Sequence, residues 1–377
     1  MKSFPATVCL CVWLSLAAAP VRPCCHAQES RAWSHVPVNI HFGQTDGDLT
    51  DAQIDFLSGH ADIVTLEKGH GAGVHGSTER GIAETARRIK ARNPHVKVLF
   101  YFNTFINWPR YESFESYNPE WTLRGPTGEI LTHRSGRPRP DLSNPAFREW
   151  WSDVVAREMR RGPVDGLFAD ALAQALQPGL ARTLGGAKAR AVATGLEEMM
   201  VLTKRKIGPD KIILANGTRG VENRGLLDWP GVDGIMIEHF DAFSSRQPEQ
   251  LKADLDTMEL AAQRGKLVSL KGWPGFTWMD DETMKRPKAE LLAVARDRIT
   301  FPLACFLVAA QPGGYFCYSW GYRESHGTLD PYPELRRPLG PPKSAATWNG
   351  LQATREFEHV SVWVDLETKR ARLDWRD

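Results

Sequence analysis

Short apolar runs rich in β-branched and aromatic residues alternate with longer stretches of helical periodicity along most of the chain. Runs of this kind are typical of strands buried on both faces of a parallel sheet. The alternation occurs eight times. The predicted strands are residues 36–42, 61–66, 97–102, 166–169, 212–215, 234–237, 267–270 and 315–318.

The segments between these runs repeat apolar residues every three to four positions, as one face of a helix does. Ile82, Ala83, Ala86 and Ile89 form such a face. Asn144 followed by Pro145 is typical of a helix start, with a capping side chain and then proline in the first turn. The predicted helices are residues 78–91, 145–160, 187–206, 248–264 and 287–307.

Eight strand–helix units predict an α/β fold, a (β/α)8 TIM barrel, because parallel strands need helical crossovers and eight of them close a ring. A doubly wound open sheet is the alternative. Polar residues favour the barrel, since they recur where successive predicted strands end, and those ends surround one mouth in a barrel. They are Glu67, Lys68, Asn103, Asp170, Asn216, Glu238, His239, Lys271 and Trp320.

Three further stretches complete the predicted organisation. Two long insertions follow the third and fourth strands, at residues 104–144 and 172–186, and the first reads as an ordered lid or binding loop. Residues 330–349 are rich in proline, and residues 356–375 alternate apolar and polar around a turn. We therefore expect a leader at 1–27, a catalytic barrel at 28–329, and a connection with a short C-terminal β-hairpin at 330–377 packed on the barrel.

The first residues have the pattern of a signal peptide. Lys2 precedes an almost unbroken apolar run over residues 4–19, and cleavage is expected near Ala27. The protein is then secreted or periplasmic. A retained signal anchor is the alternative, and lipoprotein processing at Cys24 or Cys25 fits less well because no small-residue lipobox precedes them. Beyond the leader only Cys305 and Cys317 remain, either as two buried thiols or as one disulfide.

Composition limits the kinds of molecule that the protein is expected to bind. The chain has 47 basic and 45 acidic residues, a net charge of +2, so no global field draws it to nucleic acid or to an anionic membrane. Its 13 tryptophans suit the C–H faces of sugars, although most such rings belong to cores. No dinucleotide fingerprint, phosphate loop or nucleophile elbow is present. The group His60, His70 and His75 fits solvated or capping roles better than a metal site, so no metal and no cofactor are expected.

The strongest chemical signal is a repeated pattern of Val-Asp-Gly, three apolar residues and an acid. It occurs at residues 164–170 and 232–238 and ends in Asp170 and Glu238. Hydrolysis of an acetal needs one carboxyl that protonates the leaving oxygen and one carboxylate that attacks or stabilises the sugar cation. We assign Asp170 as nucleophile and Glu238 as general acid and base. Ion pairing with Lys or Arg near the mouth is the structural alternative for both acids.

Other side chains near the predicted mouth are candidates for substrate binding. Carboxylates, amides, lysine and aromatic rings are the groups that contact sugar hydroxyls and sugar faces. For each one, packing or helix capping is the alternative, and an unpaired Lys271 would favour a uronate or a sulfated sugar. The candidates are Glu67, Lys68, Tyr101, Asn103, Asp141, Asn216, His239, Lys271, Trp273 and Trp320, with Trp108 and Trp278 as further rings.

The chain resembles a family of uncharacterised bacterial glycoside hydrolases built on a TIM barrel, related in pattern to the α-galactosidase-like clan. The resemblance runs from about Asn39 to Trp375, and the order of its motifs is more specific than any one of them. The motifs are residues 65–68 (TLEK), 100–103 (FYFN), 141–145 (DLSNP), 148–151 (REWW), 165–170 (DGLFAD), 237–240 (IEHF) and 355–359 (REFEH). The resemblance implies an aspartate nucleophile on strand four and an acid and base on strand six, which match Asp170 and Glu238. Ala171 stands where related sequences often have a second acid.

Three functions are consistent with these patterns. The first is a glycoside hydrolase that cleaves oligo- or polysaccharide with two carboxylates, with retention of configuration as the expected outcome. The second is a polysaccharide lyase, in which Lys271 or a tyrosine abstracts a proton. The third is a non-catalytic carbohydrate-binding barrel.

Overall fold

The computed structural model describes residues 33–44 and 46–376. Eight parallel strands follow one another in chain order, and each pairs with the next. A bridge between Val38 and Phe316 brings the last strand beside the first, so the sheet closes into a barrel. The strands are β1 (Asn39–Phe42), β2 (Ile63–Leu66), β3 (Lys97–Asn103), β4 (Gly166–Asp170), β5 (Ile212–Asn216), β6 (Gly234–Ile237), β7 (Leu267–Gly272) and β8 (Gly314–Tyr318).

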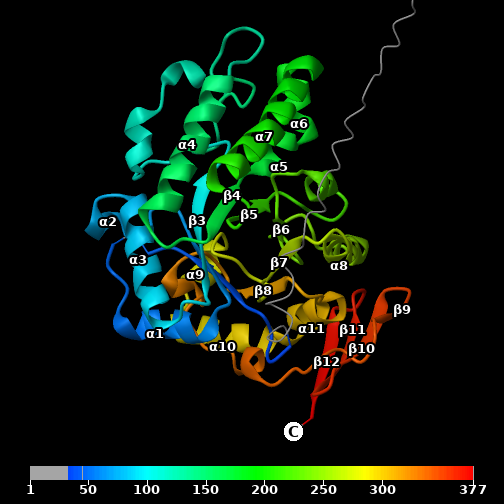
Figure 1. The fold of residues 1–377 in the computed structure, drawn as a ribbon. Helices are drawn as coiled ribbons and strands as arrows, with labels where there is room; N and C mark the ends of the chain where they lie inside the picture. Colours follow the sequence, from blue (N-terminus) through cyan, green and yellow to red (C-terminus); the bar gives the residue numbers. More distant parts are fainter. Residues whose placement is uncertain (1–32, 45, 377) are drawn as a thin grey trace, which may run out of the picture.

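Helices cover the outside of this barrel (Figure 1). Four of the five predicted helices agree with the structure to within a residue at each end. The segment 287–307, predicted as one helix, is instead two, because Pro302 has no N–H to continue the ladder. The helices are α1 (Asp51–His60), α2 (Ala72–His75), α3 (Thr78–Arg92), α4 (Pro145–Arg161), α5 (Leu172–Leu176), α6 (Pro178–Leu184), α7 (Gly186–Ile207), α8 (Pro248–Gln263), α9 (Asp281–Met284), α10 (Lys288–Arg298) and α11 (Thr300–Ala309).

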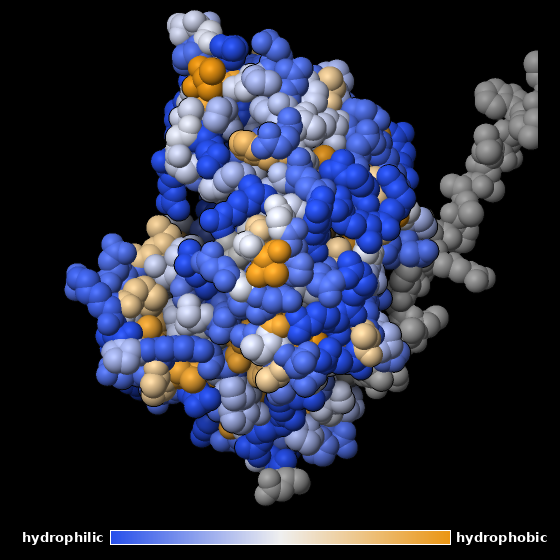
Figure 2. Space-filling view, turned by 90° about the vertical axis from the view of Figure 1, so that its left-hand side faces the viewer, coloured by the Kyte–Doolittle hydropathy of each residue, from blue (hydrophilic) through white to orange (hydrophobic). Residues whose placement is uncertain are grey.

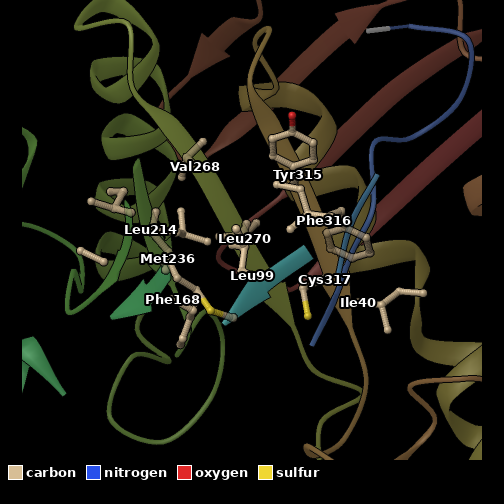
Figure 3. Close-up of a cluster of buried hydrophobic side chains, with 14 of the residues drawn as sticks. Ile40, Leu99, Phe168, Leu214, Met236, Val268, Leu270, Tyr315, Phe316 and Cys317 are labelled. Carbon is tan, nitrogen blue, oxygen red and sulfur yellow. The ribbon is translucent and has the colours of Figure 1, made fainter. Parts of the chain in front are cut away.

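Apolar side chains from many strands fill the barrel. Leu99, Phe168, Leu214 and Met236 come from four different strands and are all buried (Figure 3). Side chains alternate between the two faces of a strand, so residues two positions further on lie on the same inner face. This alternation carries polar residues at the strand ends to the interior side of the barrel mouth.

The first insertion, residues 104–144, rises beside α4 at the top of the view in Figure 1. It contains two 3₁₀ turns, η2 (Glu112–Ser116) and η3 (Pro119–Trp121), followed by a ribbon in which Thr122 pairs with Pro140. The second insertion, residues 172–186, folds into α5 and α6. Both insertions are therefore ordered.

The C-terminal segment contains the predicted hairpin and two more strands. β11 (Val360–Asp365) and β12 (Arg370–Trp375) form the hairpin, and β10 (Gln352–Glu356) and β9 (Thr347–Asn349) extend it to a four-stranded antiparallel sheet. The sheet packs on α11 (Figure 1). This confirms the predicted fold class, a TIM barrel with a C-terminal β appendage.

The expected leader lies outside the described residues. No helix in the described part of the chain is long and apolar enough to cross a membrane. The face in Figure 2 is mainly hydrophilic, with hydrophobic residues scattered over it. Cys305 and Cys317 are both free and buried, so the structure has thiols where a disulfide was the alternative.

Candidate active site

Three neighbouring strands bring the two acids together. Asp170 is the last residue of β4, Asn216 is the last residue of β5, and Glu238 directly follows β6. Each lies two residues beyond an apolar side chain of the barrel interior, Phe168, Leu214 and Met236 respectively. The period of two that buries these apolar residues also turns Asp170, Asn216 and Glu238 into the mouth.

A single side-chain amide connects the acids. Asn216 Nδ2 donates to Asp170 Oδ1 over 2.9 Å and to Glu238 Oε2 over 3.0 Å. These two oxygens therefore lie at most about 6 Å apart, and close to 5 Å apart if the two amide hydrogens diverge at about 120°. Retaining glycosidases keep their carboxyl groups about 5 to 5.5 Å apart, and inverting ones about 6.5 to 9.5 Å.

Asp170 is held by hydrogen-bond donors on both oxygens. Its Oδ2 accepts from the Tyr101 hydroxyl and, over 2.8 Å, from Asn103 Nδ2. Thr104 donates its backbone N–H and its hydroxyl to the Asp170 carbonyl, at 3.0 and 2.7 Å. Ala171 then turns the chain with a φ of +69°, a conformation that side chains other than glycine seldom adopt. A strained turn directly after a carboxylate is common at functional sites.

Glu238 lies against aromatic side chains. Its Oε1 accepts from the Tyr322 hydroxyl, and its backbone carbonyl accepts from Trp273 Nε1 over 2.8 Å. The Trp273 ring contacts Phe243, Trp278 and Tyr322, with centroids 5.5, 5.6 and 6.1 Å away. Phe243 and Trp278 are partly exposed. These four rings form an aromatic wall beside Glu238, which is suited to sugar faces.

His239 contacts the second oxygen of Glu238. Its Nε2 is 3.5 Å from Glu238 Oε2 and 3.4 Å from Arg219 Nη2, while its Nδ1 is buried without a partner. A guanidinium has no acceptor atom, so the contact with Arg219 requires the lone pair of Nε2. That places the ring hydrogen on Nδ1 and leaves Nε2 unable to donate to Glu238.

A buried ion-pair network lies on the Asp170 side of the mouth. Glu67 contacts His41 Nε2 at 3.0 Å and Lys68 Nζ at 2.5 Å. Although burial opposes it, the charge of Lys68 and the close contact with His41 lower the pKa of Glu67 to about 2. Burial lowers the pKa of Lys68, but the charge of Glu67 outweighs burial, so this pKa is raised. The ammonium lies 5.0 Å from the Tyr101 ring, so Lys68 is adjacent to the group that holds Asp170.

The two acids differ in electrostatics. Burial and the charge of Glu238 raise the pKa of Asp170. Burial acts in the same direction on Glu238, but contacts with His239, Tyr322 and Asn216 outweigh it and place the pKa of Glu238 well below its usual range. The His239 contribution needs an Nε2–H donor, which the contact with Arg219 disfavours. The hydrogen position on His239 therefore determines whether His239 can donate to Glu238 and so help to lower its pKa.

Lys271 is connected to Glu238 only through the rings of Trp273 and Tyr322, while Trp320 and Asp141 lie apart from the acid pair. Lys271 has no exposed surface, and its ammonium donates to Ser319 Oγ over 2.6 Å between the rings of Trp273 and Tyr322. Trp320 is 1 % exposed, and its ring packs on that of Phe276, 5.7 Å between centroids. Asp141 pairs with Lys188 at 2.6 Å and caps a turn through Ser143.

The other predicted residues are brought together. Glu67, Lys68, Tyr101, Asn103, Asn216, His239 and Trp273 each contact one of the two acids or a residue that does.

Four residues of the site were missed in the sequence, namely Tyr322, His41, Arg219 and the loop residue Phe243. Tyr322 follows Trp320 by two positions in a loop, where no periodicity indicates which ring turns inward. His41 is a polar residue inside a predicted apolar strand, and that contrast could have marked it. Arg219 lies in the loop after β5 and had no local signal. Among residues 33–44 and 46–376, no group of three or more His, Cys, Asp or Glu side chains could hold a metal ion.

Comparison with solved structures shows the fold. An α-amylase from Geobacillus thermoleovorans, complexed with acarbose, is 13% identical with a TM-score of 0.50, over 88% of this chain and 86% of that one. The glycoside hydrolase domain of PelA from Pseudomonas aeruginosa is 13% identical with a TM-score of 0.49, over 79% and 96%. An α-galactosidase, AgaA, from Geobacillus stearothermophilus, in complex with 1-deoxygalactonojirimycin, is 12% identical with a TM-score of 0.48, over 87% and 47%.

Sequence comparison gives the family. No curated protein matches the chain. The profile described as "Hypothetical glycosyl hydrolase family 15" matches residues 90–361, well over half of the 377 residues. The matched region includes both acids, the bridging amide and the whole first insertion. The chain therefore belongs to hypothetical glycosyl hydrolase family 15, which confirms its resemblance to a glycoside hydrolase family.

Proposed function

We propose that the protein hydrolyses glycosidic bonds of an oligo- or polysaccharide by a double displacement that retains anomeric configuration. The observation that carries this proposal is the Asn216 amide, which hydrogen bonds to both Asp170 and Glu238. A spacing of at most about 6 Å is shorter than the separation of about 6.5 to 9.5 Å that leaves room for an additional water between the acids. It therefore supports retention.

In the first step, an Asp170 oxygen attacks the anomeric carbon while Glu238 gives its proton to the departing glycosidic oxygen. The products are a glycosyl ester of Asp170 and a free alcohol. In the second step, Glu238 takes a proton from water, whose oxygen attacks the same carbon and releases Asp170 as carboxylate. The net reaction consumes one water and breaks one C–O bond.

The hydrogen-bond partners support this assignment of roles. Tyr101, Asn103 and Asn216 all donate to Asp170, which suits an ionised, acceptor-only nucleophile. Glu238 has two such donors, Tyr322 and Asn216, and gains none from His239 Nε2 when the ring hydrogen is on Nδ1. The raised pKa of Asp170 and the lowered pKa of Glu238 favour the exchanged roles, which is the alternative assignment.

The aromatic wall and the polar strand ends are proposed to bind the sugar. Phe243 and Trp278 offer ring faces beside Glu238, and Lys68 offers donors beside Asp170. We also propose that the leader directs the enzyme out of the cytoplasm, to polymeric substrates in the periplasm or beyond. In the lyase alternative Lys271 would be the base, and its lack of exposed surface argues against that role.

Turnover of a glycan panel by wild type, Asp170→Asn and Glu238→Gln tests the proposal. Each variant should lose at least about a hundredfold in kcat/KM, because acid–base and nucleophilic groups contribute about that much or more. The exposed acids Asp153 and Glu249 provide matched controls, and Asp153→Asn and Glu249→Gln should match wild type. Wild-type rates in either site variant would refute the proposal.

Chemical rescue with azide separates the two assignments. With Asp170→Gly, azide replaces the nucleophile and should give a glycosyl azide of inverted configuration. With Glu238→Ala, azide attacks the glycosyl ester and should give the retained configuration. The opposite pairing would exchange the roles. Products that absorb in the ultraviolet would indicate a lyase, and glycan binding without turnover would indicate a binding barrel.

A further inference from the structure

The ribbon of the first insertion is strongly basic. Residues 124–139 contain Arg124, Arg134, Arg137, Arg139 and His133 but only one acid, Glu129. In the described part of the chain, none of these four arginines has a carboxylate within 4.0 Å, the ion-pair distance. This contrasts with arginines elsewhere, such as Arg92 and Arg161, each of which pairs with two acids.

Arg137 lies next to the catalytic mouth through a shared ring. Its Cζ is 5.9 Å from the centroid of Trp108, and Lys68 Nζ is 5.6 Å from the same centroid. The His133 ring also contacts Trp108, with centroids 5.9 Å apart. Lys68 in turn lies 5.0 Å from the Tyr101 ring, and the Tyr101 hydroxyl donates to Asp170. Two rings, those of Trp108 and Tyr101, therefore connect the basic ribbon to Asp170, the proposed nucleophile.

These groups have unused donors. Lys68 uses one of its three N–H groups on Glu67, and its side chain is 37% exposed. The guanidinium of Arg137 makes no hydrogen bond with the described residues, and only the backbone carbonyl of Arg137 accepts one, from His133 N–H. Trp108 Nε1 is also without a partner there. Within the described residues, two cations therefore lie near one ring, and the Arg137 guanidinium has no carboxylate within 4.0 Å.

We propose that Lys68, Trp108 and Arg137 form a subsite for a carboxylate or sulfate group on the substrate, so that the glycan cleaved is anionic. This inference rests on the proposed glycosidase function. A guanidinium matches the paired oxygens of a carboxylate or a sulfate, and a bound anion offsets the repulsion between Lys68 and Arg137. Glu67, Asp170 and Glu238 surround the Lys68 end, so the substrate anion binds at the Arg137 end.

Binding to the full-length Asp170→Asn variant tests this subsite without turnover. The probes are length-matched oligosaccharides in neutral and anionic pairs: galactan and its 6-sulfate, galactan and oligogalacturonate, glucan and oligoglucuronate. In titration calorimetry, at least one anionic probe should bind at least about tenfold more tightly than its neutral partner. That preference should shrink as salt rises, because ions screen an exposed charge pair.

Adding Arg137→Gln should weaken binding of the anionic probe about tenfold or more and leave the neutral probes unchanged. Arg370→Gln, an exposed arginine on the C-terminal sheet, is the control and should change neither. Carboxylate and sulfate probes show which anion is preferred. The inference is overturned if no anionic probe binds, if neutral probes bind as tightly, or if Arg137→Gln binds like its parent.

The outcomes separate this inference from the proposed function. Hydrolysis of neutral glycans alone would leave the glycosidase proposal standing and remove the anionic subsite. Tight binding of anionic glycans that wild type never cleaves would keep the subsite and remove the proposed hydrolysis.

Discussion

At the scale of single residues, His239 connects a loop arginine to the chemistry of Glu238. Its Nε2 lies between Arg219 and Glu238 at nearly equal distances, 3.4 and 3.5 Å. Nε2 carries either a lone pair, which can accept from Arg219, or a hydrogen, which can be donated to Glu238. We therefore expect Arg219 to act as a positioning residue that affects Glu238 through the tautomer of His239.

Arg219→Gln should move the alkaline limb of the pH profile of kcat/KM to lower pH, by up to about one unit. Without the guanidinium, Nε2 can carry the hydrogen and donate to Glu238; a hydrogen bond to a charged group is worth about 1.5–3 kcal/mol, and the loss of the Arg219 charge offsets part of this. The acid form of Glu238 is present below its pKa and lost as pH rises through it. Asp170, Tyr322, Lys68 and Lys271 also face Glu238 and are unchanged by this substitution.

Two measurements distinguish this role from a structural one. Aryl glycosides with dinitrophenol leaving groups need little protonation, so Arg219→Gln should slow them less than it slows natural glycosides. Arg182→Gln, at an exposed site on α6, should leave the profile in place. An unchanged alkaline limb in Arg219→Gln would show that His239 does not control Glu238.

At the scale of elements, Arg355 attaches the C-terminal sheet to the barrel. It lies on β10, is 3% exposed, and donates from Nη1 to the carbonyls of Leu307, Val308 and Ala310, at 3.0, 3.2 and 2.5 Å. These carbonyls lie at the C-terminal end of α11, where helix groups lack internal partners and the helix dipole favours a positive charge.

Arg355→Met should lower the free energy of unfolding by about 2–4 kcal/mol, because it keeps the aliphatic stem and leaves buried carbonyls unpaired. The midpoint of urea denaturation measures this loss. Arg370→Met on β12 is the matched control, and its exposed side chain predicts a change within about 0.5 kcal/mol. Equal midpoints for the two variants would contradict the capping role.

The sequence predicted the elements well where burial follows a simple period. Most core strands were found because their residues are almost all apolar, and Asp170 stood out because an acid ends such a run. The separation of α10 from α11 was not predicted, since a proline three residues into α11 is also compatible with an uninterrupted first turn. Tyr322 and Arg219 could not be predicted, because loop geometry rather than periodicity directs their side chains.

At the scale of the whole molecule, the buried carboxyl of Asp254 links stability to pH. It lies on α8, where Gly220 N–H donates to Oδ1 and Oδ2 has no partner. Burial, partly offset by that hydrogen bond, raises the pKa of Asp254 from 3.8 to about 7. Between these values the unfolded chain is ionised and the folded one is protonated, so stability falls as pH rises.

Asp254→Asn should remove this dependence. Relative to the variant, wild type should lose up to about 4 kcal/mol of unfolding free energy between pH 4 and pH 8, the equivalent of a three-unit shift. Urea denaturation of both proteins across that range measures the difference, in which other titrating groups cancel. A constant difference from pH 4 to pH 8 would show that Asp254 stays ionised in the folded protein.

The Asn216 bridge also bears on how such enzymes diversify. The distance between the two acids depends on the ends of β4, β5 and β6, whereas Lys68, Trp108 and Arg137 come from β-strand loops and the first insertion. Under the proposed mechanism, mutations in residues 104–144 should alter which glycan is recognised while the stereochemical outcome stays the same. Homologues that differ in this insertion but keep the amide should cleave with the same stereochemical outcome and differ in the glycans that they accept.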